Sequence, residues 1–345
     1  MKLSRSLALN LSKYIVRPVK KVENYDVVKS TELKIDETIA VFFRRYLNFT
    51  GLKSIMMPTS FGQMHYYDSN PTSNLKPLIL VHGLGCTAQN MWLLGKMFAN
   101  KRRIIMPDLF HMGGFSIPQN SIMNVQDHTQ SLLEFIKQIT PHSVDLCGSS
   151  MGGWFSLLIA AKEKLLVRNL ILITPSGPSL KLPELKETIL NLTWREFKYM
   201  YPGILKAFPY TGVPIFSAAA RRGSYRNLKR KQVADLLRVI KPEDFLESLL
   251  TEIKSSVLLL WGSEDKFLSS KIPELMMKSI KNIHGKWIGN CAHAPHLETP
   301  AVCYNEINQF LNLTKIKDND FSKFILKFSK MHKVSPIEKG FHNDY

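Results

Sequence analysis

The sequence predicts an α/β fold: a mostly parallel sheet with helices on both faces, interrupted by an inserted helical cap. Short apolar runs recur along the chain, and longer segments of helical pattern separate them. Nearly continuous apolarity is typical of strands covered on both faces, and alternation with helices favours right-handed βαβ units. The alternation breaks between about residues 175 and 254, which predicts the cap.

Six apolar runs are expected to form the parallel strands, namely Leu78–Val81, Arg103–Met106, Val144–Cys147, Leu170–Ile173, Val257–Trp261 and His284–Ile288. The helical candidates that alternate with them lie around residues 89–99, 125–138, 151–164, 271–281 and 300–312. Two earlier segments, roughly 53–58 and 63–67, flank Ser60-Phe-Gly62. They suggest an antiparallel hairpin at the edge of the sheet.

The chain of 345 residues fits one large α/β domain with an insertion. The break in the strand–helix pattern is helical in tone but holds several prolines, among them Pro183, Pro202, Pro209, Pro214 and Pro242, and many aromatic residues. The expected division is a basic N-terminal extension (1–50), a core (51–175 and 255–313), a cap or lid (176–254) and a basic C-terminal tail (314–345).

The net charge of +18 is concentrated in three stretches. Residues 1–22 and 221–231 each carry six Lys or Arg and no acid, and residues 315–345 carry seven Lys and four acids. Such clustering favours attraction to an anionic surface. The sequence has no zinc-finger, RRM or KH signature, so no nucleic-acid partner is expected.

Both termini show apolar residues at helical spacing among the cations, as in Leu3, Leu7 and Leu11 and again in Phe321, Phe324 and Phe328. Basic amphipathic helices are typical of membrane-surface anchors. Two alternatives stay open: docking of each stripe on the protein body, and an organellar transit peptide at the N-terminus. No transmembrane helix or standard secretory signal is visible. The expected location is therefore cytoplasmic, with peripheral membrane attachment and organellar import left open.

Gly148-Ser-Ser-Met-Gly152 is the only G-x-S-x-G pattern in the chain. It follows a predicted strand and opens a predicted helix, which is the context that a nucleophile elbow requires. The register names Ser150, rather than Ser149, as the nucleophile. The alternative is a helix N-cap rich in serine and glycine.

Two more motifs follow predicted strands. His82-Gly-Leu-Gly85 could present the backbone N–H of Leu84 to a substrate carbonyl, with the N–H of Met151 as a second donor. Such a donor pair forms an oxyanion hole, although a simple glycine turn is the commoner outcome. Trp261-Gly-Ser-Glu-Asp265 offers a carboxylate at the carboxyl end of a strand, where parallel sheets bind ligands. Asp265 is preferred and Glu264 is its rival.

The segment Gly289–Pro300 holds two histidines, His293 and His296. A single loop histidine is more often structural than catalytic. The order of the candidate residues along the chain supports His293 as the general base. Ser150 comes first, then Asp265, then His293, each in the loop after a strand. That is the order of the Ser–Asp–His triad on an α/β sheet with a nucleophile elbow.

Together these motifs resemble the α/β-hydrolase family over roughly residues 50–313, and within it the monoacylglycerol lipase and carboxylesterase branch, which includes carbon–carbon bond hydrolases. The resemblance implies acid and base at the positions of Asp265 and His293, and no metal or organic cofactor. Residues Asp108–Ser116 resemble a structural loop of the family, with His111 and Phe115 in place of small residues. Ala292 stands where glycine commonly precedes the histidine.

The leading hypothesis is a serine hydrolase that cleaves carboxylic esters of apolar acyl chains or lipids through an acyl-enzyme. The aromatic residues of the cap could line an acyl pocket, or at least half of them could pack the cap's own core; they are Trp194, Phe197, Tyr199, Tyr201, Phe208, Tyr210 and Phe216. One alternative is a thioesterase or acyltransferase whose basic stretch Arg221–Lys231 docks acyl-CoA or an acyl carrier protein. Another is a catalytically silent binding protein.

Overall fold

The computed structural model of the chain describes residues 30–69, 73, 75–177, 189–200, 214–244 and 247–316. The strands within these residues are β1 (Lys53–Thr59), β2 (Gly62–Asp68), β3 (Leu78–Val81), β4 (Ile104–Pro107), β5 (Ile117–Pro118), β6 (Val144–Ser149), β7 (Val167–Ile173), β8 (Ser256–Gly262) and β9 (Ile283–Ile288). They form one nine-stranded sheet in the order β1-β2-β4-β3-β6-β7-β8-β9, with β5 paired to β2.

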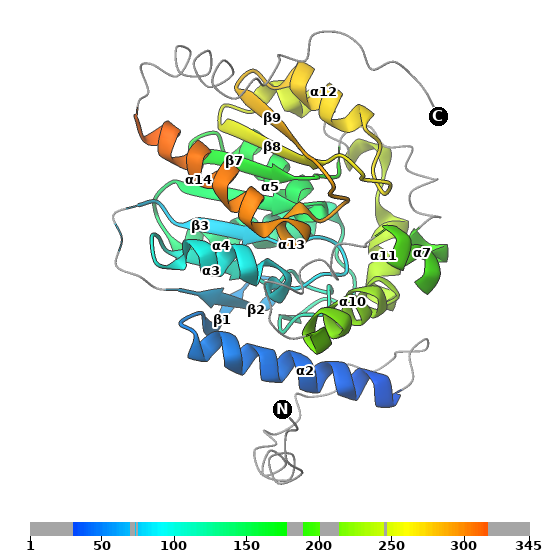
Figure 1. Cartoon of the computed structure of the whole chain (residues 1–345). Coiled ribbons are helices and arrows are strands. Elements are labelled where there is room, and N and C mark those ends of the chain that lie inside the picture. Colours follow the sequence, from blue (N-terminus) through cyan, green and yellow to red (C-terminus); the bar gives the residue numbers. More distant parts are fainter. Residues whose placement is uncertain are drawn as a thin grey trace.

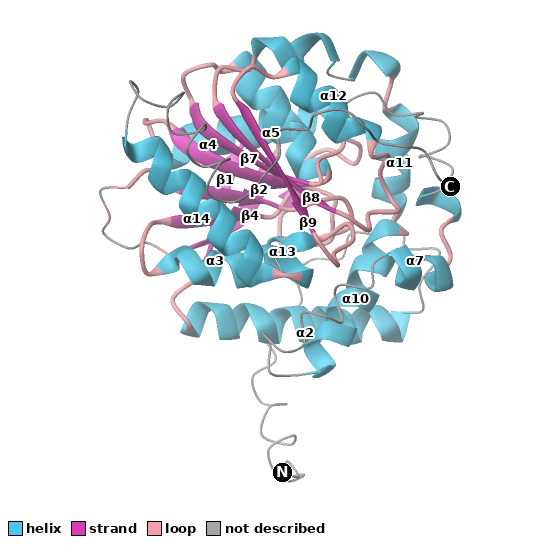
Figure 2. Ribbon diagram, turned by 45° about the horizontal axis from the view of Figure 1, so that its top comes forward, coloured by secondary structure: helices cyan, strands magenta, loops and turns pink. Residues whose placement is uncertain are grey.

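Strands β4, β3, β6, β7, β8 and β9 pair in parallel, whereas β2 pairs antiparallel with β1, β4 and β5. Figure 2 shows these strands twisting relative to one another between two layers of helices. The predicted α/β class with a mostly parallel sheet is therefore confirmed, as is the antiparallel hairpin at the edge of the sheet.

The α-helices are α2 (Ser30–Phe49), α3 (Trp92–Ala99), α4 (Val125–Ile139), α5 (Met151–Lys162), α7 (Trp194–Met200), α10 (Pro214–Leu228), α11 (Lys231–Val239), α12 (Lys271–Ser279), α13 (Pro295–Glu298) and α14 (Pro300–Ile316). The described residues also contain the short 3₁₀ helices η2 (Ala88–Met91), η3 (Pro242–Asp244) and η4 (Glu247–Glu252). All five predicted helical segments of the core are helical, with boundaries shifted by a few residues.

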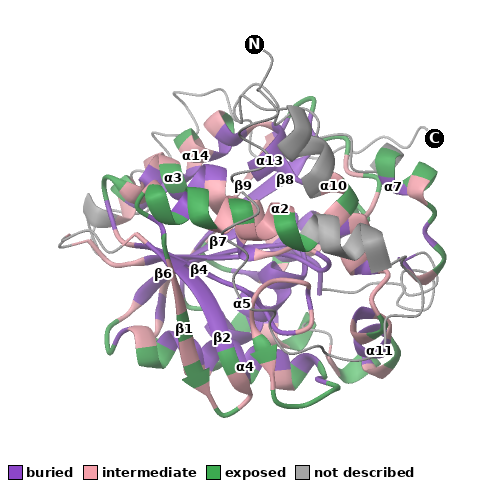
Figure 3. Cartoon of the chain, turned by 90° about the horizontal axis from the view of Figure 1, so that it is seen from below, coloured by how far each residue is buried: buried purple, intermediate pink, exposed green. Residues whose placement is uncertain are grey.

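Two hydrophobic clusters fill the spaces on either side of the sheet. Side chains of α3 and α14, such as Phe98 and Ile307, pack on one face, and side chains of α4 and α5, such as Leu132 and Leu157, pack on the other. Figure 1 shows α3 and α14 in front of the sheet and α5 behind it, and Figure 3 shows buried strands between helices whose outer faces are exposed. Burial on both faces explains why these strands read as continuous apolar runs.

Helix α2 and the two-residue strand β5 are elements that the sequence analysis did not predict. Helix α2 lies beside β1 and packs Phe43 edge-on against Trp92, with ring centroids 5.3 Å apart. The guanidinium of Arg44 lies 4.4 Å from the ring centroid of Phe115. The aromatic residue that replaces a small one in the Asp108–Ser116 loop therefore serves as a contact for this helix.

Helices α7, α10 and α11 lie together at one end of the sheet. The end of α10 lies over the loops that follow β3 and β4, because a Cβ atom added to Gly85 would meet Leu228 and one added to Gly113 would meet Asn227. These helices belong to the segment expected to form the cap, and the division of the chain into core and cap stays a prediction. In the described ranges, no helix combines the length and apolarity needed to cross a bilayer.

Candidate active site

Ser150 stands at the turn between β6 and α5, with a backbone φ of 51° and ψ of −118°. A non-glycine residue in this region is strained by about 1–3 kcal/mol, and such strain is common at functional sites. Three backbone hydrogen bonds hold the turn: Ser150 N–H donates to Ile173 O at 3.0 Å, and Ser150 O accepts from Ser176 N–H at 3.0 Å and Trp154 N–H at 3.1 Å. The geometry is that of the predicted elbow.

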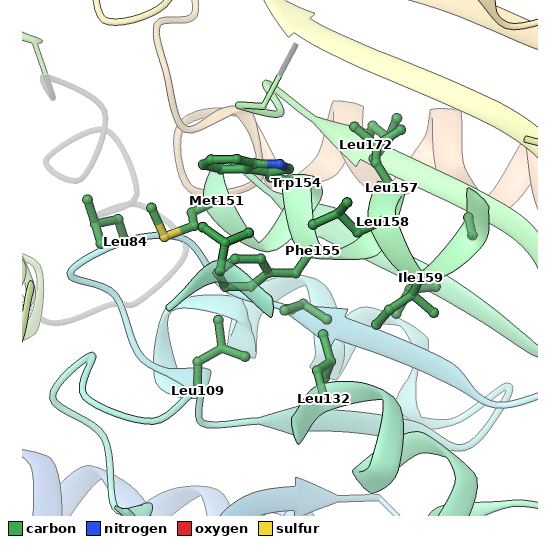
Figure 4. Close-up of a cluster of buried hydrophobic side chains, with 14 of the residues drawn as sticks. Leu84, Leu109, Leu132, Met151, Trp154, Phe155, Leu157, Leu158, Ile159 and Leu172 are labelled. Atoms are coloured by element: carbon green, nitrogen blue, oxygen red, sulfur yellow. The ribbon is translucent and has the colours of Figure 1, made fainter. Parts of the chain in front are cut away.

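The two glycines of the G-x-S-x-G motif are needed because backbone atoms approach them closely. A Cβ atom on Gly148 would overlap the backbone oxygen of Gly152, and one on Gly152 would overlap the backbone oxygen of His82. Helix α5 behind the turn is buried along nearly its whole length. Figure 4 shows its side chains, among them Trp154, Phe155 and Leu158, packed in the hydrophobic cluster. The elbow therefore rests on a rigid support.

The structure brings Ser150, His293 and Asp265 together from three separate loops. Ser150 Oγ lies 3.0 Å from His293 Nε2, and His293 Nδ1 lies 2.8 Å from Asp265 Oδ2. A carboxylate accepts hydrogen bonds only, so Nδ1 carries the proton and Nε2 is free to accept the Ser150 hydroxyl proton. The other carboxylate oxygen, Asp265 Oδ1, accepts the backbone N–H groups of Phe267 at 2.8 Å and Leu268 at 3.2 Å.

The rival residues lie outside this line of contacts. Glu264 is exposed, whereas the Asp265 side chain is fully buried. His296 is buried, and its Nδ1 has no hydrogen-bond partner among the described residues. Burial, together with the neighbouring His293, lowers the pKa of His296 to about 3. His296 therefore stays neutral at physiological pH.

Leu84 and Met151, the expected oxyanion donors, lie on the two segments that meet at Ser150. A Cβ atom added to Gly83 would lie 3.0 Å from Ser150 Cβ, so the loop after β3 runs against the candidate nucleophile. Figure 4 shows the Leu84 and Met151 side chains close together at one end of the cluster. Met151 is the first residue of α5. The N–H groups of the first turn of a helix have no carbonyl acceptor within the helix, so the Met151 N–H can donate to a substrate.

The His82 side chain has a role that the sequence analysis did not foresee. Its Nε2 accepts the Leu109 N–H at 2.9 Å, so Nδ1 carries the proton and donates to Gly83 O at 2.9 Å. Burial lowers the pKa of His82, against the opposing influence of Asp108 and of the hydrogen bond to Gly83. Because Gly83 O and Leu84 N–H belong to one trans peptide, the neutral ring also orients the expected oxyanion donor.

The described aromatic residues of the expected cap pack mainly on one another. Phe197 is fully buried, and its ring lies 5.9 Å from Trp194 and 5.4 Å from Tyr225, measured between centroids. The Arg221 guanidinium lies 5.4 Å from the Trp194 ring centroid. Tyr201, Phe208 and Tyr210 lie outside the described residues, as do the side chains of Tyr199 and Phe216. Phe197, and Trp194 packed beside it, thus belong to the same hydrophobic cluster as the side chains of α4 and α5.

Among the described residues, no group of three or more His, Cys, Asp or Glu side chains is arranged to hold a metal ion. His293 contacts Asp265 and Ser150, and elsewhere in the fold His65 Nδ1 donates to Asp108 Oδ2 at 2.6 Å. The arrangement is suited to proton transfer between side chains.

Comparison with known proteins places this geometry in a family. Lipase 1 of Psychrobacter immobilis is 24% identical over 259 residues, which cover 72% of this chain and 80% of the lipase. Two crystal structures show the same fold. The membrane phospholipase A described as a bacterial virulence factor has a TM-score of 0.68 at 21% identity, covering 90% of this chain and 97% of that one. Naproxen esterase of Bacillus subtilis has a TM-score of 0.66 at 18% identity, and the match covers 84% of this chain and 99% of the esterase.

A model of the alpha/beta hydrolase family matches residues 78–306, about two thirds of the chain. The matched range includes the elbow, the loop after β3, and the segments that carry Asp265 and His293. The chain therefore belongs to the α/β-hydrolase family.

Proposed function

We propose that this α/β hydrolase cleaves carboxylic esters through an acyl-enzyme formed on Ser150. The observation that carries the proposal is the continuous line of hydrogen-bonding contacts, 3.0 Å from Ser150 Oγ to His293 Nε2 and 2.8 Å from His293 Nδ1 to Asp265 Oδ2. Lipases and esterases among the similar proteins support an ester hydrolase activity.

In the proposed reaction, Ser150 Oγ attacks the ester carbonyl carbon while His293 Nε2 takes the hydroxyl proton. Asp265 holds the imidazole in the required tautomer and stabilises the imidazolium that forms. The backbone N–H groups of Leu84 and Met151 stabilise the negative charge on the carbonyl oxygen, a contribution of roughly 3–4 kcal/mol for each donor. His293 then returns the proton to the leaving alcohol.

Deacylation repeats these steps with water. His293 removes a proton from a water molecule that attacks the acyl carbonyl, and the proton returns to Ser150 as the carboxylic acid leaves. Each step uses residues that the chain itself provides. We propose that the acyl group is apolar, as the similarity to a lipase suggests.

A panel of p-nitrophenyl esters from acetate to palmitate, extended with a monoacylglycerol and an acyl-CoA, tests the proposal. We expect turnover of the esters, with kcat/KM rising as the acyl chain lengthens. Preference for acyl-CoA would favour the thioesterase alternative instead. If a protein that is folded by circular dichroism hydrolyses none of these substrates, the ester hydrolase proposal is wrong and the chain is a catalytically silent binding protein.

We also propose that the basic stretches draw the enzyme to an anionic membrane surface. Residues 1–22 and the tail, which carry two of the three basic stretches, lie almost wholly outside the described residues. The third stretch, Arg221–Lys231, directs part of its charge inward: Arg221 lies over Trp194, and Lys229 Nζ donates to Leu190 O at 2.8 Å. The proposal therefore depends chiefly on the termini, where each cation near an anionic leaflet contributes about 1 kcal/mol.

Co-sedimentation with liposomes tests the membrane proposal. The full chain is expected to bind vesicles containing phosphatidylserine, less as salt rises, and to bind weakly after residues 1–20 are deleted. Vesicles of phosphatidylcholine alone serve as the control. Equal binding to both kinds of vesicle, or no binding at low salt, would contradict the proposal.

A further inference from the structure

The backbone around His293 is held by side chains other than those of Ser150 and Asp265. His293 O accepts the hydroxyl of Thr174 at 2.7 Å, and the two flanking N–H groups, on Ala292 and Ala294, both donate to the carboxylate of Glu298. Three consecutive residues are therefore fixed by two buried polar side chains. Both side chains contact backbone atoms of residues 292–294, so we expect them to act through the histidine.

Thr174 follows β7 directly and has a φ of 42°. A residue branched at Cβ seldom adopts this conformation, since its side chain crowds the backbone. The residue is fully buried, and its N–H donates to Leu260 O at 2.8 Å, which ties it to the neighbouring β8. The strained backbone thus presents the hydroxyl to the carbonyl of the candidate base.

Glu298 ends the short helix α13 and is almost completely buried. Its Oε2 lies 2.9 Å from Ala292 N, and its Oε1 lies 3.1 Å from Ala294 N. Burying a carboxylate costs free energy unless both of its oxygens accept hydrogen bonds. The Glu298 carboxylate therefore favours a backbone conformation in which the N–H groups of Ala292 and Ala294 both point toward it. A glutamine could not replace it, because an amide offers one acceptor oxygen and one donor group.

We propose that Thr174 and Glu298 are positioning residues that fix the His293 backbone, so that the imidazole reaches Ser150 and Asp265 at once. The inference rests on the proposed function, since it assigns its two residues to the same reaction. Displacement of a catalytic group by about 1 Å costs on the order of 100-fold in rate. Loss of either contact should therefore lower kcat more than it changes KM.

The test compares purified variants on an ester that the wild type hydrolyses. Thr174→Val removes the hydroxyl but keeps the shape and the branched Cβ, and Thr174→Ser keeps the hydroxyl. Glu298→Gln leaves one of the two N–H groups without an acceptor. Thr129→Val is the matched control, because Thr129 is a buried threonine in α4 whose hydroxyl also donates to a backbone carbonyl, Val125 O, at 2.7 Å.

We expect kcat to fall about tenfold to 100-fold in Thr174→Val and Glu298→Gln, with KM within about twofold. Thr174→Ser should recover most of the rate, and Thr129→Val should keep wild-type kcat. Melting temperatures show whether each variant is folded. Wild-type kcat in both Thr174→Val and Glu298→Gln, beside an inactive His293→Ala, would overturn the inference alone. Full activity of His293→Ala would overturn the proposed function and this inference with it.

Discussion

At the scale of single residues, two carboxylates and two histidines compete for the roles of acid and base. His293 contacts both Ser150 and Asp265, so we expect substitutions of His293 and Asp265 to have larger effects than those of their rivals. His293→Ala should reduce kcat/KM on the order of a millionfold, and Asp265→Asn roughly 10⁴-fold, because the acid orients the base rather than moving the proton.

The matched controls for these variants are His296→Ala and Glu264→Gln. Exposed Glu264 should tolerate the change, and buried His296 should lose more stability than catalytic rate. Steady-state kinetics on one p-nitrophenyl ester compares all four proteins. Equal losses in His293→Ala and His296→Ala would leave the base unassigned.

The residues of the candidate site differ in how far the sequence could predict them. Ser150 stands at a fixed place in a motif, and the resemblance to the α/β-hydrolase family favours Asp265 over Glu264. Thr174 and the ring of His82 carry no comparable pattern. Thr174 contacts a carbonyl 119 positions away, and a hydroxyl at the end of a strand is an ordinary feature of sequences. Such roles depend on tertiary contacts, which periodicity does not encode.

At the scale of elements, the most apolar strands are the ones that the sequence predicts, because burial on both faces leaves a short apolar run in β3, in β8 and at the end of β7. Helix α2 was not predicted, because residues 1–50 were assigned to a basic N-terminal extension without regard to their apolar spacing. Its stripe of Ile35, Ile39 and Phe43, spaced four residues apart, was a helical signal in the sequence.

The contact between α5 and β3 provides a prediction at this scale. A methyl group added by Gly152→Ala would overlap the backbone oxygens of Val81 and His82. We expect the free energy of unfolding to fall by about 1–3 kcal/mol, the usual cost of overpacking. Urea denaturation measures it.

Gly223→Ala is the matched control for this variant. Gly223 also lies in a helix, α10, and outside its own helix backbone no atom of the described residues lies within 4 Å of the position that its Cβ would take. Alanine there should raise the free energy of unfolding by about 0.5–1 kcal/mol, because it favours the helix over the unfolded chain. Similar changes in both variants would mean that α5 and β3 are not in close contact.

At the scale of the whole molecule, stability should depend on pH through buried histidines. Both ring nitrogens of His128 lack a hydrogen-bond partner among the described residues, and the ring stacks on Phe155 at 5.5 Å between centroids. Burial, with smaller contributions from His111 and His82, lowers the pKa of His128 from its usual 6.5 to about 3. The folded protein therefore holds this ring neutral.

The unfolded chain takes up a proton on His128 as pH falls below about 6.5, whereas the folded protein does so only near pH 3. The contribution to stability is therefore complete above pH 6.5 and is lost as pH falls from 6.5 to 3, by about 1.4 kcal/mol per pH unit. Urea denaturation at several pH values between 4.5 and 6 measures how steeply the free energy of unfolding rises with pH. This slope should be smaller by about 1.4 kcal/mol per pH unit in His128→Leu than in the wild type. Identical slopes would contradict a buried neutral ring.

The overall architecture places Ser150, with its strained backbone, at the carboxyl edge of the parallel strands, and we propose that this serine carries the acyl group. Mass-spectrometric mapping of the protein after treatment with a fluorophosphonate probe tests it most directly. We expect one adduct on Ser150, absent in Ser150→Ala and retained in Ser149→Ala. An adduct on another residue, or undiminished labelling of the Ser150→Ala protein, would contradict it.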